Sequence, residues 1–80
     1  MATETSWIQK RSIELIVAAM ERSQLSARAL ADTTGIPFTR VARKLVGGSD
    51  FTFSELYLIA AALGVSPSDL VPSAPAGAAA

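Results

Sequence analysis

Apolar residues recur along this chain at intervals of three and four, the spacing that lines one face of an α-helix. Two stripes follow this spacing: Ile13, Ile16, Val17 and Met20, and further along Leu56, Ile59, Ala60 and Leu63. The alternation that is typical of a strand appears only in Phe51-Thr-Phe53, between a Gly-Gly-Ser-Asp loop and the second stripe. The pattern therefore predicts an all-α protein.

Capping and stop signals delimit the first three predicted helices. A Ser-x-x-Gln capping box that begins at Ser6 starts the first helix. The second is capped by Ser26 and ends at Gly35, since glycine suits the left-handed conformation that closes a helix. Pro37 fits the first turn of the third helix, which two glycines end. The first and third helices cover about residues 7–23 and 37–46.

Two more helices complete the predicted domain. A Thr-Phe-Ser-Glu capping box at Thr52 starts the fourth helix, and Gly64 stops it. Ser66 caps a short fifth helix, which Pro72 stops. The sequence thus predicts a compact five-helix bundle, organised as a disordered N-terminus over 1–5, a domain over 6–71, and a disordered Pro/Ala-rich tail or linker stub over 72–80.

Residues 26–45 combine two short helices around the turn at Gly35. At about 100° per residue, Val41 and Leu45 share the core-facing side of the second of these helices, so its polar residues point outward. A short helix, a tight turn and a helix with outward-facing donors form the layout of a helix-turn-helix. This layout makes DNA binding the leading hypothesis.

Charge is distributed unevenly along a chain whose formal net charge is zero. Residues 26–48 hold four basic residues against Asp32, a net charge of +3, and residues 49–80 have a net charge of −3. The predicted helix-turn-helix therefore forms a local basic face on a neutral protein.

Several chemistries are excluded by composition. The chain has no Cys and no His, which removes disulfides, most zinc sites and the usual general bases. No enzyme activity, cofactor, metal or small-molecule ligand is therefore predicted. No signal peptide is visible, and the longest apolar stretch, Leu56 to Leu63, is too short to span a bilayer. We expect a cytoplasmic protein of a bacterium or a phage-infected host, associated with the nucleoid when bound to DNA.

The chain resembles the Cro/phage-repressor (Xre-type) helix-turn-helix domain over about residues 10–71. The matching residues are Leu25-Ser26, Leu30-Ala31, Gly35-Ile36, Val41, Gly47, the run from Leu56 to Ser66, and Asp69-Leu70. The closing segment LGVSPSDLV is especially typical of the family. The basic pair before Leu45 and the Thr-Phe-Ser-Glu helix start resemble repressors of phages and mobile elements.

The resemblance implies that the second helix crosses the DNA backbone and the third enters the major groove. It implies base contacts from four residues: Phe38, Thr39, Arg40 and Arg43. Ala27 stands where family members often have a Gln that contacts a phosphate. Pro37 replaces the usual capping residue of the family and Phe38 a commonly polar residue at the start of the third helix, so no sequence preference is transferred from a relative.

Three residues of the third helix are the main candidates for DNA contact. Arg43 faces outward at mid-helix, and an arginine can bond guanine at both O6 and N7. Arg40 suits a base or a phosphate equally. Thr39 suits a phosphate, a thymine methyl group or a base edge. The alternative for each is an ordinary solvated surface residue.

Four further residues are secondary candidates. The stem of Lys44 is expected to pack at the core edge while its ammonium group reaches out to a phosphate. Phe38 either packs at the rim of the core or touches a thymine methyl group. Arg28 is placed to reach a flanking phosphate, and Ser49 to donate to one from the loop.

These features favour a sequence-specific transcriptional repressor that binds double-stranded DNA. A homodimer, or two copies binding cooperatively, would occupy half-sites about one DNA turn apart and exclude polymerase. Leu70 and Val71 are the predicted dimer contact. Four cationic contacts per subunit predict a slope of about −7 for log affinity against log salt. The alternative is a protein-interaction module on the same fold, such as an antitoxin or antirepressor.

Overall fold

The structure, a computed structural model, describes residues 3–72, with side chains from residue 7 onward. Within this range the chain forms four α-helices, one turn of 3-10 helix and no strand. The elements are α1 (Thr3–Ser23), α2 (Ala27–Thr34), α3 (Phe38–Leu45), α4 (Phe53–Leu63) and η1 (Pro67–Leu70). The all-α prediction is confirmed. The predicted fifth helix is a single 3-10 turn, since the backbone is already extended at Val71.

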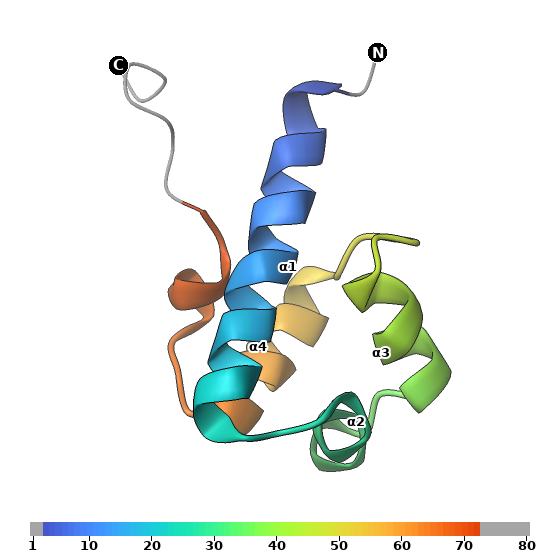
Figure 1. Cartoon of the computed structure of the whole chain (residues 1–80), viewed down its shortest axis with the longest axis vertical. Helices are drawn as coiled ribbons and strands as arrows, with labels where there is room; N and C mark the ends of the chain where they lie inside the picture. Colours follow the sequence, from blue (N-terminus) through green and yellow to red (C-terminus); the bar gives the residue numbers. More distant parts are fainter. Residues whose placement is uncertain (1–2, 73–80) are drawn as a thin grey trace.

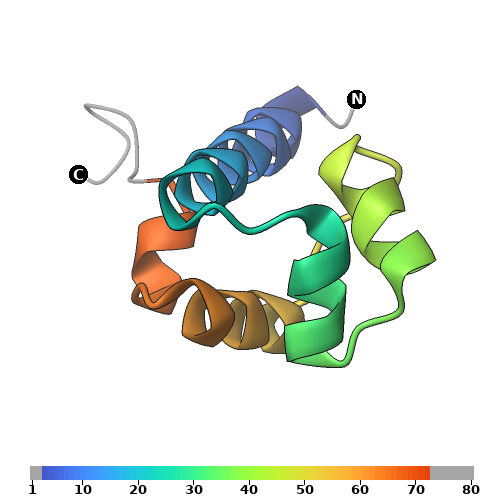
Figure 2. The ribbon, with the colours of Figure 1, turned by 60° about the horizontal axis from the view of Figure 1, so that its bottom comes forward.

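The elements form two groups around a shared core, with α1, α4 and η1 in one group and α2 and α3 in the other. Figure 1 shows α1 running the length of the molecule beside α4, with η1 on one side and α2 and α3 on the other. Each element contributes one fully buried large side chain: Ile16, Leu30, Val41, Ile59 and Leu70. The helix α2 packs against both α3 and α4, whereas α3 packs mainly against α2. As Figure 2 also shows, α3 lies at the outer edge of the fold.

Helix boundaries differ from the predictions in two places. The helix α1 begins at Thr3 rather than after a cap at Ser6, since no glycine or proline interrupts the preceding residues. The helix α3 is one residue shorter at each end than expected. Pro37 has an extended ψ of 138° and precedes the first helical residue, and Val46 lies just past the last one. Residues 1–2 and the predicted tail over 73–80 lie outside the described residues.

Local hydrogen bonds define both ends of α2 and the turn that leads to α3. At the start of α2, Ser26 caps the helix by accepting a bond from the Ala29 amide at 3.1 Å. Gly35 has a φ of 81°, which glycine adopts without steric cost. The hydroxyl of Thr34 donates to the Leu30 carbonyl at 2.8 Å and accepts from the Ile36 amide at 3.2 Å. These bonds set the direction in which the chain enters α3.

The predicted capping box of α4 is present. The Glu55 amide donates to the Thr52 hydroxyl at 3.1 Å, and the Thr52 amide donates to the Glu55 carboxylate at 2.8 Å. Because this box fixes the Glu55 side chain at the start of α4, it also determines which surface the carboxylate faces.

Candidate nucleic-acid interface

A polar hollow lies along the uncovered side of α3. It has a volume of about 380 Å³ and is lined by Pro37, Thr39, Arg40, Arg43, Lys44 and Ser49. Five of these six residues are DNA contacts expected from the sequence. Thr39, Arg40 and Arg43 are exposed, and α3 contains no acidic residue. The structure therefore gathers donors and positive charge on one accessible surface.

The position of Arg43 depends on Gly48 in the loop that follows α3. The Gly48 amide donates to the Arg43 carbonyl at 2.9 Å. A Cβ atom at residue 48 would lie 2.5 Å from Cγ of Arg43 and 3.0 Å from its carbonyl oxygen. The loop therefore closes against the stem of Arg43 because residue 48 has no side chain. The Gly-Gly pair in the sequence indicates only a helix stop, because the contact with Arg43 depends on how the loop folds back.

Replacing Gly48 with alanine is expected to weaken DNA binding about two- to tenfold, a change of roughly 0.4–1.4 kcal/mol. The new methyl group would overlap with Cγ of Arg43 and so displaces the Arg43 side chain. Fluorescence anisotropy with a labelled DNA duplex that the natural protein binds measures the change. Gly47→Ala is a poor control because Gly47 has a φ of 88°. In an Arg43→Ala background the clash with the Arg43 stem is absent, so Gly48→Ala should have little further effect there. An equal loss in that background would contradict the explanation.

Arg28 and Phe38 form a stacked pair between α2 and α3. The guanidinium carbon of Arg28 lies 4.3 Å from the centroid of the Phe38 ring, a cation–π contact. Phe38 is half-buried and packs against the core, the first of the two places expected for it. The stack orients the exposed Arg28 beside the start of α3.

Lys44 does not reach solvent as predicted. Only 8% of the residue is exposed, and its ammonium group forms an ion pair with Oε1 of Glu55. Lys44 lies three residues after Val41 on α3, near the core-facing side, and α4 supplies an acidic partner there. The prediction of an ammonium group free for a phosphate is therefore wrong.

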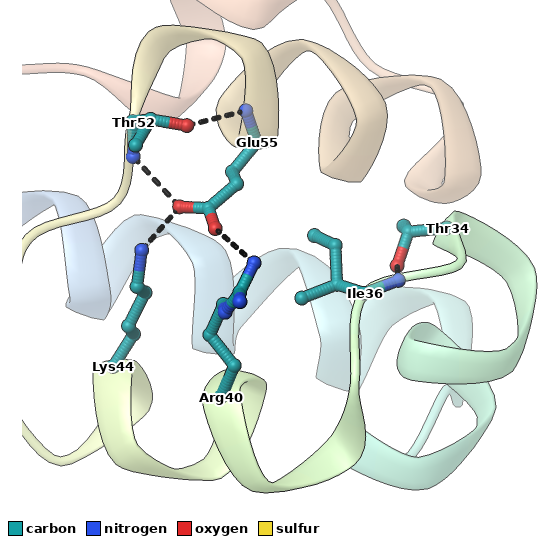
Figure 3. A network of polar contacts seen from close by, with 6 residues as sticks. All are labelled: Thr34, Ile36, Arg40, Lys44, Thr52 and Glu55. Carbon is teal, nitrogen blue, oxygen red and sulfur yellow. Dashed lines mark hydrogen bonds and ion pairs between the residues drawn. The ribbon is translucent and has the colours of Figure 1, made fainter.

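Glu55 also faces a second cation of α3. Its Oε2 lies 3.9 Å from a guanidinium nitrogen of Arg40. Figure 3 shows the carboxylate between the two α3 side chains on one side and Thr52 on the other. The Arg40 side chain is 57% exposed, against 10% for Glu55, so Arg40 keeps a surface for other partners. The sequence predicts only a capping role for Glu55, since the two cations belong to a different helix.

The surroundings of Glu55 favour its ionised form. Burial by itself raises the pKa of the carboxyl group, but this is outweighed by hydrogen bonds from Lys44 and Thr52 and by the positive charge of Lys44. The pKa of Glu55 therefore lies below its ordinary value. Because the carboxylate bridges α3 and α4, its charge contributes to holding α3 in place.

This lowered pKa predicts acid sensitivity. A carboxyl whose pKa is lower in the folded than in the unfolded state stabilises the fold above the unfolded value, near about 4.3. That contribution is lost as the pH falls through the folded pKa of Glu55. Glu55→Gln is expected to lower the free energy of unfolding at pH 7, and the difference from the natural protein should shrink below about pH 4. Urea unfolding across this pH range measures it. A difference that stays constant with pH would contradict the assignment.

One of the two residues predicted to form the dimer contact is not on the surface. Leu70 is buried in the core, so it does not form part of a dimer surface in this fold. Val71, the other predicted contact, is exposed. Among the described residues, no three His, Cys, Asp or Glu side chains are grouped to hold a metal ion, and no helix is long and apolar enough to cross a membrane.

Comparison with known protein families gives one match. A family model described as helix-turn-helix matches residues 16–70, which include all of α2, α3, α4 and η1. A search of curated proteins finds no match to the chain. The matched family is regulatory rather than catalytic. The family model covers most of the chain, and the turn between α2 and α3 leads into an exposed basic helix. This chain therefore belongs to the helix-turn-helix family of Cro/C1-type DNA-binding regulators.

Proposed function

We propose that this protein is a sequence-specific transcriptional repressor whose α3 enters the major groove. The observation that carries the proposal is the hollow on the uncovered side of α3, where Thr39, Arg43 and Ser49 lie together. The major groove is about 12 Å wide and admits an α-helix. An α-helix at the edge of the fold with exposed donors and no acidic residue suits that groove.

Individual roles follow from exposure and contacts. Arg43 is the base-contacting residue, since its exposed guanidinium group suits the two acceptors of guanine. Thr39 contacts a base edge or a phosphate beside it. Arg40, Arg28 and Ser49 contact phosphates, which position the helix on the duplex. Phe38 mainly orients Arg28, because its ring stacks against the Arg28 guanidinium group. Lys44 acts within the protein rather than on DNA.

A single domain with so few cations binds DNA weakly, so two copies are needed. We propose a homodimer, or cooperative binding of two copies, on half-sites about one helical turn apart. Occupancy of the site excludes polymerase. The phage or mobile-element type of repressor rests on the sequence resemblance alone.

The structure changes the expected salt dependence. With Lys44 paired inside the protein and Arg43 assigned to a base, two cations per subunit remain for phosphates: Arg28 and Arg40. Four such cations per pair of subunits predict a slope of about −4 for log affinity against log salt, rather than about −7. Titrations of a duplex at several salt concentrations measure the slope. A nearly flat response would contradict the phosphate contacts.

The proposed function is tested by selection from fragmented bacterial or phage genomic DNA at low salt, followed by sequencing of the retained fragments. Enrichment of a short motif, repeated or inverted at about ten base pairs, supports a regulator that binds specific sites. Retention of DNA without a motif overturns sequence specificity. Absence of retention overturns DNA binding by the isolated chain.

A second function is favoured by one observation on α4. This helix exposes Phe53, Tyr57 and Leu58, and its only charged residue, Glu55, is buried. An uncharged apolar helix face fits a protein-interaction module, such as an antitoxin or antirepressor, on the same fold. Substitution of Arg43 distinguishes the two functions, since it affects only the DNA-binding one.

A further inference from the structure

We infer that Glu55 is a specificity-determining residue: it holds Arg40 against the protein and so weakens binding to DNA of the wrong sequence. The inference rests on the proposed function and deepens it. Glu55 does not itself touch DNA in this account. It acts on the exposed cation of α3 with which it forms an ion pair.

The Glu55 carboxylate is fixed before it meets Arg40. Its Oε1 accepts hydrogen bonds from the Lys44 ammonium group and from the Thr52 amide, the latter at 2.8 Å. These two partners come from opposite sides, one from α3 and one from the start of α4 (Figure 3). Oε2 is left facing Arg40 at 3.9 Å. The carboxylate therefore has one orientation, and Arg40 is the partner that moves.

Arg40 consequently has two ways to meet DNA. In the first, it stays near Glu55 and presents its exposed side to a phosphate beside the major groove, which requires α3 to be fully inserted. In the second, it swings away from Glu55 toward any nearby phosphate. In a sequence-independent complex α3 is not docked on the bases. Such binding therefore depends on phosphate contacts that Arg40 makes after it swings away from Glu55.

Glu55 disfavours only the second way. When Arg40 swings out to a phosphate, its ion pair with Glu55 is lost. When Arg40 contacts DNA from its place beside Glu55, the ion pair is kept, and less side-chain entropy is lost because Arg40 is already ordered. An interaction that opposes binding in the wrong mode increases the ratio of specific to non-specific affinity. Without Glu55, Arg40 would be an unrestrained cation beside Arg43 on a helix that has no acidic residue. That arrangement strengthens binding to every sequence.

Two variants test the inference. Glu55→Gln removes the charge but keeps an oxygen that can accept from the Thr52 amide, since Gln also suits a capping box. The double variant Lys44→Met/Glu55→Gln removes both charges of the buried pair, leaves the net charge unchanged and avoids an unpaired buried ammonium group. Both release Arg40.

Asp69→Asn is the matched control. It removes one negative charge, as Glu55→Gln does, and its amide oxygen can still accept from the Ser66 amide. Asp69 lies on η1, on the opposite side of the molecule from α3 (Figures 1 and 2). Each variant is also made with Arg40→Ala, which removes the cation that Glu55 is inferred to hold. Circular dichroism and urea unfolding identify any variant that fails to fold.

Affinities are measured by anisotropy at several salt concentrations, for the selected operator and for a random duplex of equal length. For both Glu55 variants we expect affinity for the random duplex to rise about two- to fivefold per bound subunit. Operator affinity should rise less or fall, and the salt slope on the random duplex should steepen by about one per subunit. With Arg40→Ala, these changes should disappear.

Other results overturn the inference. If the Glu55 variants match Asp69→Asn, or lose affinity for both duplexes in parallel with stability, Glu55 has only a structural role. If its effects persist with Arg40→Ala, they do not act through Arg40. If the natural protein retains neither duplex, the proposed function fails first, and this outcome is distinct from the other two.

Discussion

Replacing Leu30 with alanine is expected to remove about 2–5 kcal/mol from the free energy of unfolding, the largest stability effect among the changes considered for this protein. Leu30 is fully buried on α2, the helix that packs against both α3 and α4. Truncation leaves a cavity at the junction of these helices, and the short α2 has few other buried side chains to compensate. For a chain of this size the total stability is about 4–12 kcal/mol. The variant should therefore be marginally folded.

Chemical denaturation followed by circular dichroism measures the Leu30 effect. Leu58→Ala is the matched control, since it makes the same change on α4 at a residue that is 44% exposed. We expect the control to change stability by less than about 1 kcal/mol. Similar losses for both variants would show that α2 is not the central packing element. DNA affinity of Leu30→Ala should recover in the presence of a stabilising osmolyte, as the folded fraction rises.

Replacing Arg43 with alanine is expected to weaken operator binding by about 1–3 kcal/mol per subunit, or roughly 5- to 150-fold. Arg43 is exposed on the uncovered side of α3 and has no ion pair with any described residue, so its guanidinium group is available for a base. If Arg43 bonds a guanine, the variant should also tolerate other bases at that one position. Its thermal stability should be close to that of the natural protein.

Arg11→Ala provides the control for charge. Arg11 is also exposed, and its only ion pair among the described residues joins it to Glu14 on the same helix at 2.9 Å. That pair is exposed and contributes little to stability. Arg11 lines a groove with η1 rather than the hollow beside α3. An equal loss of operator affinity in both variants would indicate a general charge effect. Unchanged binding in Arg43→Ala would favour the protein-interaction function.

Helix limits and caps were predictable because they depend on residues a few positions apart. The Ser26 cap, the Gly35 turn and the Thr52–Glu55 capping box all close within four residues, and all three are present. Spacing also placed Val41 on the buried face of α3. The same local logic failed at Ser6, because a capping sequence forms a cap only where the helix actually begins.

The candidate site was predictable only in part. The helical period showed that Thr39 and Arg43 point outward, and the structure places both at the hollow. It did not show that the Arg43 stem needs a glycine at residue 48, since that contact depends on how the loop folds back. The sequence predicts Leu70 as a dimer contact, but in the fold η1 packs against α1 and α4 and Leu70 is buried.

The sequence alone determined the helical class, the order of the elements and the outward face of α3, because periodicity and caps act through neighbouring residues. Only the tertiary structure decided that Lys44 is buried, that Glu55 meets both Lys44 and Arg40, and that α3 stands at the edge of the fold. Lys44 and Glu55 are eleven residues apart on different helices. Whether a lysine reaches solvent or a carboxylate depends on what the packing of other helices brings beside it, and no local pattern encodes that.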